Sequence, residues 1–264
     1  MEPKPEHLGR EYAAQFEDES VARAYYARPP YPDGVLDLID TLIVDRPRRV
    51  LELGAGSGDL ALRLARRVDA LDAVEPSAAM IAIARERQAQ PDAPSNLRWF
   101  QTSAEAHRFD GPYAGVVAAE SLHWMDWERV LPAIGRSLTP RGYLAIVTVR
   151  QLIDLPWQPQ LMALIGRHST TSAYRPYDIA YELTVRGLFD VAGQQTMIGA
   201  AFAQSAADYV ESFHSRNGFS RERMGAAAAD AFDRELHALM RAHGTTDRVE
   251  AKVTSTVLWG KPRG

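Results

Sequence analysis

Short apolar runs alternate along this chain with segments in which apolar residues recur at the spacing of a helix. Residues 50–53 are apolar apart from one glutamate, and a glycine-rich stretch at 54–58 follows directly. Leu60, Leu64 and Val68 then lie four positions apart, which places them on one face of a helix. The pattern predicts a strand, a glycine turn and a helix.

The same alternation continues toward the C-terminus. Ser77 is placed to cap the helix after the second strand, residues 139–142 indicate a turn, and residues 205–208 resemble a capping box. The expected strands are 50–53, 70–74, 97–101, 114–119, 143–149, 196–203 and 253–259, and a further helix is expected at 220–243.

Strands that alternate with helices favour βαβ units and a parallel sheet. We therefore expect an α/β, Rossmann-like fold with a seven-stranded, mostly parallel sheet and helices on both faces. The N-terminal part is expected to be a helical cap in pieces, because prolines interrupt it at 29–32. A less regular insertion follows the fifth strand. The expected single domain, 1–264, divides into a cap (1–45), a core (46–150), the insertion (151–195) and C-terminal helices with closing strands (196–264).

Composition narrows the function classes. The chain has no cysteine, which excludes disulfides, cysteine-based metal sites and cysteine nucleophiles. The net charge is −4 and there is no run of basic residues, so a nucleic-acid partner is not expected. No apolar run is long enough for a signal peptide or a membrane span, so we expect a cytoplasmic protein without membrane attachment. Neither a monomer nor a homodimer is excluded.

The three glycines of the turn carry the first chemical signal. Gly54, Gly56 and Gly58 allow positive φ and a close approach of the backbone to a ligand. Such a crevice at the end of the first strand is where open α/β sheets bind ligands. A dinucleotide fingerprint would need Gly or Ala at the position that Asp59 occupies. The spacing therefore disfavours a dinucleotide, although a glycine turn alone is weak support for any ligand.

Glu75 supplies a second signal at the end of the second strand. A carboxylate at this position offers two acceptor oxygens for the two hydroxyls of a ribose. The alternative is a surface glutamate at a strand end. The glycine turn upstream favours the ribose interpretation.

Taken in order, these motifs resemble those of class I S-adenosylmethionine-dependent methyltransferases. The resemblance is strongest to the type 11 small-molecule group, which includes trans-aconitate methyltransferase-like proteins, and it covers about residues 20–150. It implies S-adenosyl-L-methionine as cofactor and S-adenosyl-L-homocysteine as product. The stretches that carry it are 25–32 (YYARPPYP), 52–58 (ELGAGSG), 74–77 (VEPS), 121–124 (SLHW) and 138–144 (LTPRGYL), the last with Arg141 where the family often has glycine.

The resemblance also implies individual roles. The glycine turn would face the methionine part of the cofactor, Glu75 would hold the ribose, Met80 and Ser103 would flank the adenine, and Arg28 or Tyr25 would meet the methionine carboxylate. The cofactor-binding residues expected in this way are Tyr25, Arg28, Glu52, Gly54, Ala55, Gly56, Glu75, Pro76, Met80, Ser103, Ala104, Glu120 and Ser121.

Methyl transfer from a sulfonium needs orientation of the acceptor, and a base only if the acceptor must lose a proton. His123 is the candidate base, because an imidazole titrates near neutrality; packing against Trp124 is the competing interpretation. Trp124, His168, Tyr174 and Arg175 are candidates for contacts with the substrate, the last three in a lid formed by 151–195. No histidine has the spacing of a metal ligand, so no metal is expected.

The sequence thus predicts methyl transfer to a small molecule, with an oxygen of a carboxylate or hydroxyl as the favoured acceptor atom. Two alternatives stay open. The chain could be a nicotinamide-dependent oxidoreductase, or a non-catalytic cofactor-binding protein on the same fold, because a fold does not fix a function.

Overall fold

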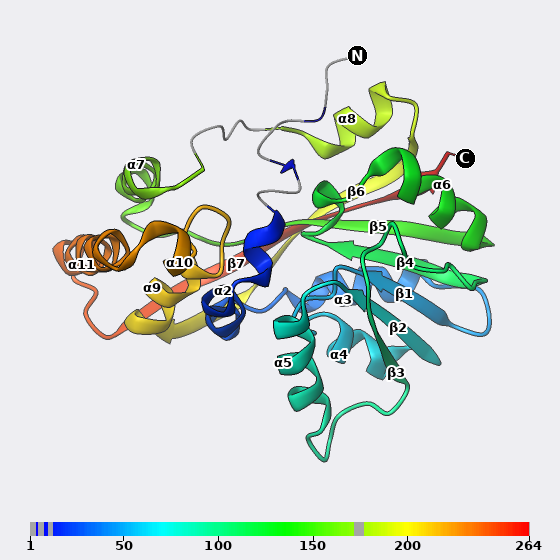
Figure 1. Cartoon of the computed structure of the whole chain (residues 1–264), viewed down its shortest axis with the longest axis horizontal. Coiled ribbons are helices and arrows are strands. Elements are labelled where there is room, and N and C mark those ends of the chain that lie inside the picture. Colours follow the sequence, from blue (N-terminus) through cyan, green and yellow to red (C-terminus); the bar gives the residue numbers. More distant parts are fainter. Residues whose placement is uncertain (1–3, 5–7, 10–12, 172–176, 264) are drawn as a thin grey trace.

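Seven strands form a single sheet in the order β3-β2-β1-β4-β5-β7-β6. The computed structural model describes residues 4, 8–9, 13–171 and 177–263 (Figure 1). The strands β1 to β5 are parallel, and β7 is antiparallel to both of its neighbours. The expected α/β fold with a mostly parallel, seven-stranded sheet is confirmed. The strands are β1 (Arg49–Leu53), β2 (Ala70–Glu75), β3 (Leu97–Gln101), β4 (Tyr113–Ala119), β5 (Leu138–Ile153), β6 (Phe189–Ser205) and β7 (Arg248–Pro262).

Helices cover both faces of the sheet, which explains why β4 at its centre has no charged residue. All seven residues of β4 are buried. On one face, α3 (Asp33–Leu42) and α4 (Ala61–Leu64) contribute Leu36 and Leu64 to a core shared with β1. On the other face, α6 (Trp127–Ser137) and α8 (Ile179–Val185) contribute Leu131 and Leu183. A strand covered on two sides has no polar face to show in its sequence.

The N-terminal segment is helical in short pieces, as expected for its described part. These pieces are η2 (Ala14–Glu17), α2 (Glu19–Ala24) and η3 (Tyr25–Ala27), and the prolines at 29–32 separate them from α3. In Figure 1, α2 lies beside α9 (Ala206–His214) and above α5 (Ala78–Gln88), over the edge of the sheet where β1 and β2 end. The segment therefore forms a roof over the ends of these strands.

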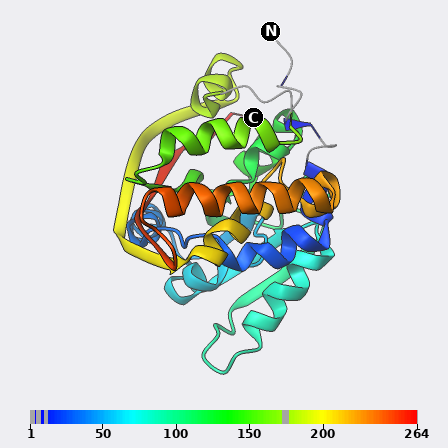
Figure 2. The ribbon, with the colours of Figure 1, turned by 90° about the vertical axis from the view of Figure 1, so that its left-hand side faces the viewer.

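The C-terminal part differs from the sequence expectation in the length of its strands. β5, β6 and β7 extend beyond the main sheet and carry a separate apolar core (Figure 2), formed with α7 (Gln158–His168), α9 and α11 (Ala226–Ala242). The expected helix 220–243 is broken at Gly225, whose φ is 77°, into α10 (Arg221–Met224) and α11. Residues 139–142 form a bulge within β5, because Leu138 pairs with Tyr113 and Tyr143 with Gly115.

The caps predicted from the sequence are confirmed. The hydroxyl of Ser77 accepts a hydrogen bond from the Met80 amide at 3.3 Å, and that of Ser205 accepts from the Asp208 amide at 2.9 Å. Each cap fixes where its helix begins and so fixes the direction of the preceding chain. The remaining short helices are η4 (Ala65–Arg67) and η5 (Leu122–Trp124). Within the described residues, no helix is long and apolar enough to cross a membrane.

Candidate functional site

A cleft of about 600 Å³ lies where β1, β2 and β4 end, beneath the N-terminal roof. Its walls come from four stretches of the core and from the roof. It brings together most of the residues that the sequence singled out. The lining residues are Ala13, Ala14, Phe16, Glu17, Tyr25, Arg28, Gly54, Gly56, Glu75, Pro76, Ser77, Met80, Ser103, Ala104, Glu105, Ala119, Glu120, Ser121, His123, Trp124, Met125 and Asn217.

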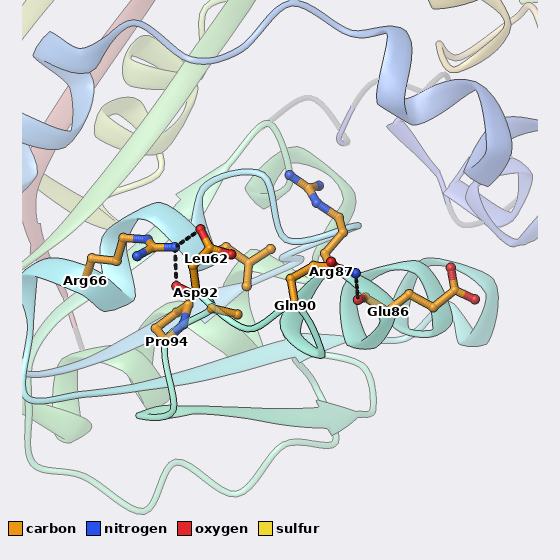
Figure 3. A pocket seen from close by; sticks show the side chains of 8 residues that line it. Leu62, Arg66, Glu86, Arg87, Gln90, Asp92 and Pro94 are labelled. Atoms are coloured by element: carbon orange, nitrogen blue, oxygen red, sulfur yellow. Dashed lines mark hydrogen bonds and ion pairs between the residues drawn. The ribbon is translucent and has the colours of Figure 1, made fainter.

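A second hollow lies away from the strand ends, between α4 and the loop after α5 (Figure 3). Arg66 donates to the Asp92 carbonyl at 2.6 Å and pairs with the Asp92 carboxylate at 3.4 Å across it. Its polar groups are thus paired with one another at the surface. The chemistry that the sequence predicts belongs to the first cleft.

The glycine turn forms one wall of the cleft, but its backbone donors are already used. Gly54 and Gly56 have φ of 69° and 55°. The N–H groups of Gly54 and Ala55 both donate to the Val74 carbonyl, at 2.8 and 3.1 Å. The Gly56 N–H donates to the Glu75 carboxylate at 2.9 Å. A phosphate cradle needs free N–H groups, so the first half of this turn is unsuited to a pyrophosphate.

Glu75 lies at the end of β2 with its carboxylate facing the cleft. One oxygen accepts from the Gly56 N–H and the other from the Ser77 N–H, both at 2.9 Å. Burial raises the pKa of Glu75, and the two N–H donors oppose that change. Each oxygen retains a second lone pair. The side chain is therefore fixed in one orientation and can still accept hydrogen bonds from two vicinal hydroxyls.

The next part of the wall contains apolar side chains. Met80 is 1 % exposed and sits at the first turn of α5, and Ser103 and Ala104 follow β3. Pro76 lies between Glu75 and the cap of α5. These residues, to which the resemblance assigns the adenine, all line the cleft.

Two expected cofactor contacts do not line the cleft. Glu52 is 1 % exposed within β1, and burial, with Asp59 and Glu75 nearby, raises its pKa to about 8. Ala55 is 7 % exposed and holds its N–H against the Val74 carbonyl. Glu52 belongs to β1 and Ala55 to the turn itself, and neither side chain is among those that line the cleft. They support the turn and do not form its surface.

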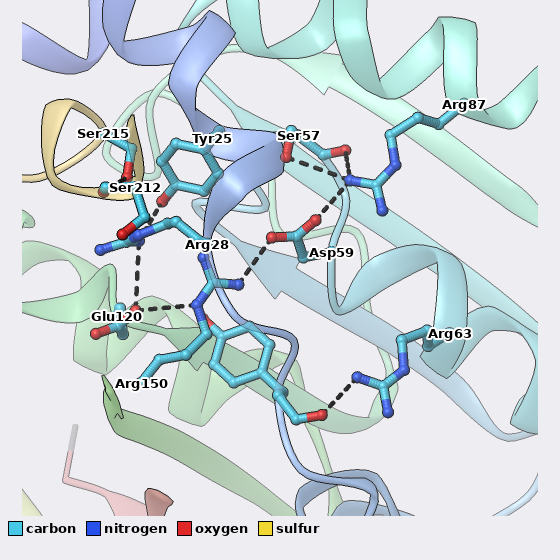
Figure 4. A network of polar contacts seen from close by, with 11 residues as sticks. Tyr25, Arg28, Ser57, Asp59, Arg63, Arg87, Glu120, Arg150, Ser212 and Ser215 are labelled. Carbon is cyan, nitrogen blue, oxygen red and sulfur yellow. Dashed lines mark hydrogen bonds and ion pairs between the residues drawn. The ribbon is translucent and has the colours of Figure 1, made fainter. Parts of the chain in front are cut away.

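Asp59, which follows the glycine turn, also lies outside the cleft. It pairs with Arg150 at 2.8 Å and with Arg87 on its other side (Figure 4). Burial alone would raise the pKa of Asp59, but the two guanidinium groups outweigh it and the pKa is lowered. Its charge is thus neutralised within the protein.

Arg28 and Tyr25 link the roof to the core at the back of the cleft. Arg28 Nη1 donates to the Tyr25 hydroxyl at 2.9 Å and to Glu120 Oε2 at 3.4 Å (Figure 4). The side chain of Arg150 is 1 % exposed, and its Nε lies 3.7 Å from the same carboxylate oxygen. Glu120 has a φ of 50°, a strained conformation for this residue type, which turns its side chain into the cleft.

His123 and Trp124 form the wall beyond Ser121. Their ring centroids lie 4.5 Å apart, and Trp124 makes an edge-to-face contact with Phe16 of the roof at 5.6 Å. His168 lies elsewhere: its Nε2 is 3.1 Å from Glu235, and its ring packs on Phe232. It does not line the cleft. Tyr174 and Arg175 lie outside the described residues.

Sequence reasoning missed several cleft residues. Asn217 is more than 60 positions beyond the resemblance, and Arg150, which lies in β5 behind the cleft residue Glu120, belongs to no motif. Phe16 had a signal, since it is one of the aromatic residues of the predicted cap. Among the described residues, no group of three His, Asp or Glu is placed to hold a metal ion.

Comparison with known proteins shows which families resemble this chain. Residues 50–142 match the family described as "Methyltransferase domain". An uncharacterized methyltransferase of Mycobacterium tuberculosis is 34% identical over 140 residues, 53% of this chain and 54% of the relative. Demethylmenaquinone methyltransferase of Thermus thermophilus is 34% identical over 113 residues, 41% of this chain and 50% of the relative. The chain thus spans about half the length of the curated relatives that it matches.

The solved structures support the fold over almost the whole chain. A "Putative Type II Methyltransferase" from Anaeromyxobacter dehalogenans has a TM-score of 0.62 at 21% identity, covering 89% of this chain and 97% of that one. At this identity the likeness speaks for the fold alone. The sequence match over residues 50–142 is to a methyltransferase domain, and the sheet is that of the methyltransferase fold seen in the solved structure.

Proposed function

We propose that this chain transfers a methyl group from S-adenosylmethionine to an oxygen of a small molecule. The observation that carries the proposal is the arrangement around Glu75. Its buried carboxylate faces the cleft, and together with Val74 it uses up the N–H groups of residues 54–56. This wall suits a ribose and a zwitterionic chain better than a pyrophosphate.

The residues of the cleft suggest a division of work. Glu75 would hold the ribose hydroxyls, Met80 and Ala104 the adenine, and Arg28 the methionine carboxylate through a charge-assisted hydrogen bond. When bound, the cofactor supplies a methyl group on a positively charged sulfur. The protein's part is to orient the acceptor and exclude water. His123 lines the cleft, where it could take a proton from the acceptor.

A small-molecule acceptor is supported by the size of the cleft. A volume of about 600 Å³ is in the usual range for small-molecule sites. The Thermus relative is named for a small acceptor, demethylmenaquinone. The trans-aconitate methyltransferase-like subgroup, which the motifs resemble, remains a prediction.

Isothermal titration tests the proposal directly. We expect S-adenosylhomocysteine to bind with a micromolar or lower Kd and NAD⁺ to show no heat. Binding of NAD⁺ alone would favour the oxidoreductase alternative. Binding of S-adenosylhomocysteine, without methyl transfer from labelled donor to any member of a broad acceptor panel, would favour a non-catalytic binding protein.

A further inference from the structure

The order of the strands fixes which end of the cleft receives the acceptor. The adenine-side residues follow β3, Glu75 ends β2 and the glycine turn follows β1. A bound cofactor therefore runs across the edge from β3 toward β1. The next strand in that direction is β4, after which Glu120, Ser121, His123 and Trp124 come in sequence. These residues surround the point to which the methyl group would be directed.

That end of the cleft is walled by rings from three distant parts of the chain. Phe16 packs edge-to-face on Trp124, with an interplanar angle of 61°. The His123 ring lies 4.5 Å from Trp124 and 6.4 Å from Tyr177, measured between centroids. Phe16, His123 and Trp124 are all partly exposed and line the cleft. Partly exposed rings can take another ring in stacked or edge-to-face contact.

The charges around this end argue against an acidic acceptor. Glu17 is exposed on the roof, and Glu105 accepts a hydrogen bond from the Asp126 amide at 2.9 Å. Of the cations among the described residues, Arg28 and Arg150 pair with Glu120, and Arg216 packs against the Phe213 ring. A carboxylate placed here would meet like charges and pay a desolvation cost. The surroundings favour a neutral molecule.

We propose that the acceptor is a neutral, planar ring bearing a hydroxyl group, and that Trp124 and Phe16 select it. This inference rests on the proposed function. The hydroxyl oxygen forms a bond to the methyl carbon, the carbon–sulfur bond breaks with its electron pair left on sulfur, and the hydroxyl proton passes to the imidazole of His123. A phenol suits this step because its hydroxyl has a pKa near 10, as in tyrosine, so partial transfer of the proton to an imidazole makes the oxygen nucleophilic.

The test compares phenol and 2-naphthol with cyclohexanol, the saturated counterpart of phenol. Each is titrated by calorimetry into protein saturated with S-adenosylhomocysteine. We expect phenol to bind at least about tenfold more tightly than cyclohexanol, from ring–ring contact at two faces. Trp124→Leu and Phe16→Leu should each remove most of this preference and change the Kd of S-adenosylhomocysteine less than about twofold. Tyr26→Leu is the matched control, because Tyr26 is an aromatic residue of the same segment, 71% exposed and outside the cleft.

The possible outcomes distinguish a failure of the proposed function from a failure of the proposed acceptor. If S-adenosylhomocysteine does not bind to the wild type, the proposed function fails before the acceptor is considered. If it binds but cyclohexanol matches phenol, or succinate binds more tightly than either, the aromatic acceptor is refuted. The same holds if both leucine variants keep the wild-type preference while remaining folded, as judged by their thermal transitions.

Discussion

The two ends of the cleft are built in different ways. The end at β1, β2 and β3 is made by residues that directly follow their strands, and its backbone hydrogen bonds are satisfied within the turn itself. The end at β4 is closed by side chains from the roof, the β4 loop and the loop that carries Asn217. The first end is rigid and local in sequence, and the second is assembled from segments about 200 positions apart.

Under the proposed function, this difference would separate cofactor binding from acceptor specificity. A ligand part common to a whole family can be read by one fixed turn and one fixed carboxylate. An acceptor that varies needs walls that can change without disturbing the sheet, and loops held by a rigid scaffold provide them. The contacts that assemble the second end are side-chain hydrogen bonds such as Gly218 N–H to Gln15 at 2.9 Å, and Ser220 to Asp18 at 2.7 Å.

Among these predictions, the largest loss of cofactor affinity is expected from Gly56→Val in the glycine turn. The φ of 55° at this position is strained for a β-branched residue, and the new side chain would project toward the Tyr25 ring. We expect the Kd of S-adenosylhomocysteine to rise more than about 100-fold, measured by calorimetry. Gly244→Val is the control: its φ is 77°, nothing lies within 4 Å of an added Cβ, and it is far from the strand ends in sequence. Equal loss of affinity in both variants would show that strain, and not the cleft, is responsible.

A second prediction concerns Glu52, which is buried in β1 before the glycine turn. Burial raises the pKa of Glu52 from 4.5 in the unfolded chain to about 8. The folded state therefore holds the proton more tightly, and the stability it gains below pH 4.5 is lost as the pH rises toward 8. Glu52→Gln mimics the protonated form. From pH 5 to pH 8 the wild type should lose about 3 kcal/mol of unfolding free energy that the variant keeps. Urea unfolding at both pH values measures this. An unchanged pH dependence would mean that Glu52 is ionised in the fold.

Glu75→Ala should weaken binding of S-adenosylhomocysteine about 30-fold, because it removes two acceptors for the ribose and the anchor of the Gly56 amide. Glu75→Gln keeps one acceptor and should cost about tenfold. Glu86→Ala, an exposed acidic residue of α5, is the control and should have no effect. If Glu75→Ala binds as the wild type does, with an unchanged thermal transition, the ribose assignment is wrong.

The sequence predicted the end of the cleft at β1, β2 and β3 better than the end at β4. The strand, turn and helix at 50–68 were predictable because each signal is local: an apolar run, three glycines and a helical stripe. Glu75 was predictable because a strand end in a parallel sheet faces the crevice. The burial of Glu52 was not inferred, although its place inside an otherwise apolar strand could have indicated it.

The rest depended on contacts between distant segments. Nothing near Arg150 in the sequence shows that its guanidinium pairs with Asp59, 91 positions earlier. The lengths of β5, β6 and β7 were underestimated because their outer halves are part exposed and their apolar residues face a separate helical layer. His168 was assigned to a substrate lid from its composition, whereas its contacts with Glu235 and Phe232 hold α7 against α11.

The smallest expected effect comes from a comparison of His123, which lines the cleft, with His168, which does not. If His123 takes the acceptor's proton, His123→Gln should lower kcat about tenfold or more and leave the Kd of S-adenosylhomocysteine unchanged, since the side chain lies beyond the methyl group. The loss should shrink as the pH approaches 10, where a phenol ionises without a base. His168→Gln should alter neither value, because its ring lies on α11, outside the cleft. Turnover of labelled donor with phenol, followed from pH 6 to 10, measures both. A constant loss at every pH, with a lowered thermal transition, would instead assign His123 to packing against Trp124.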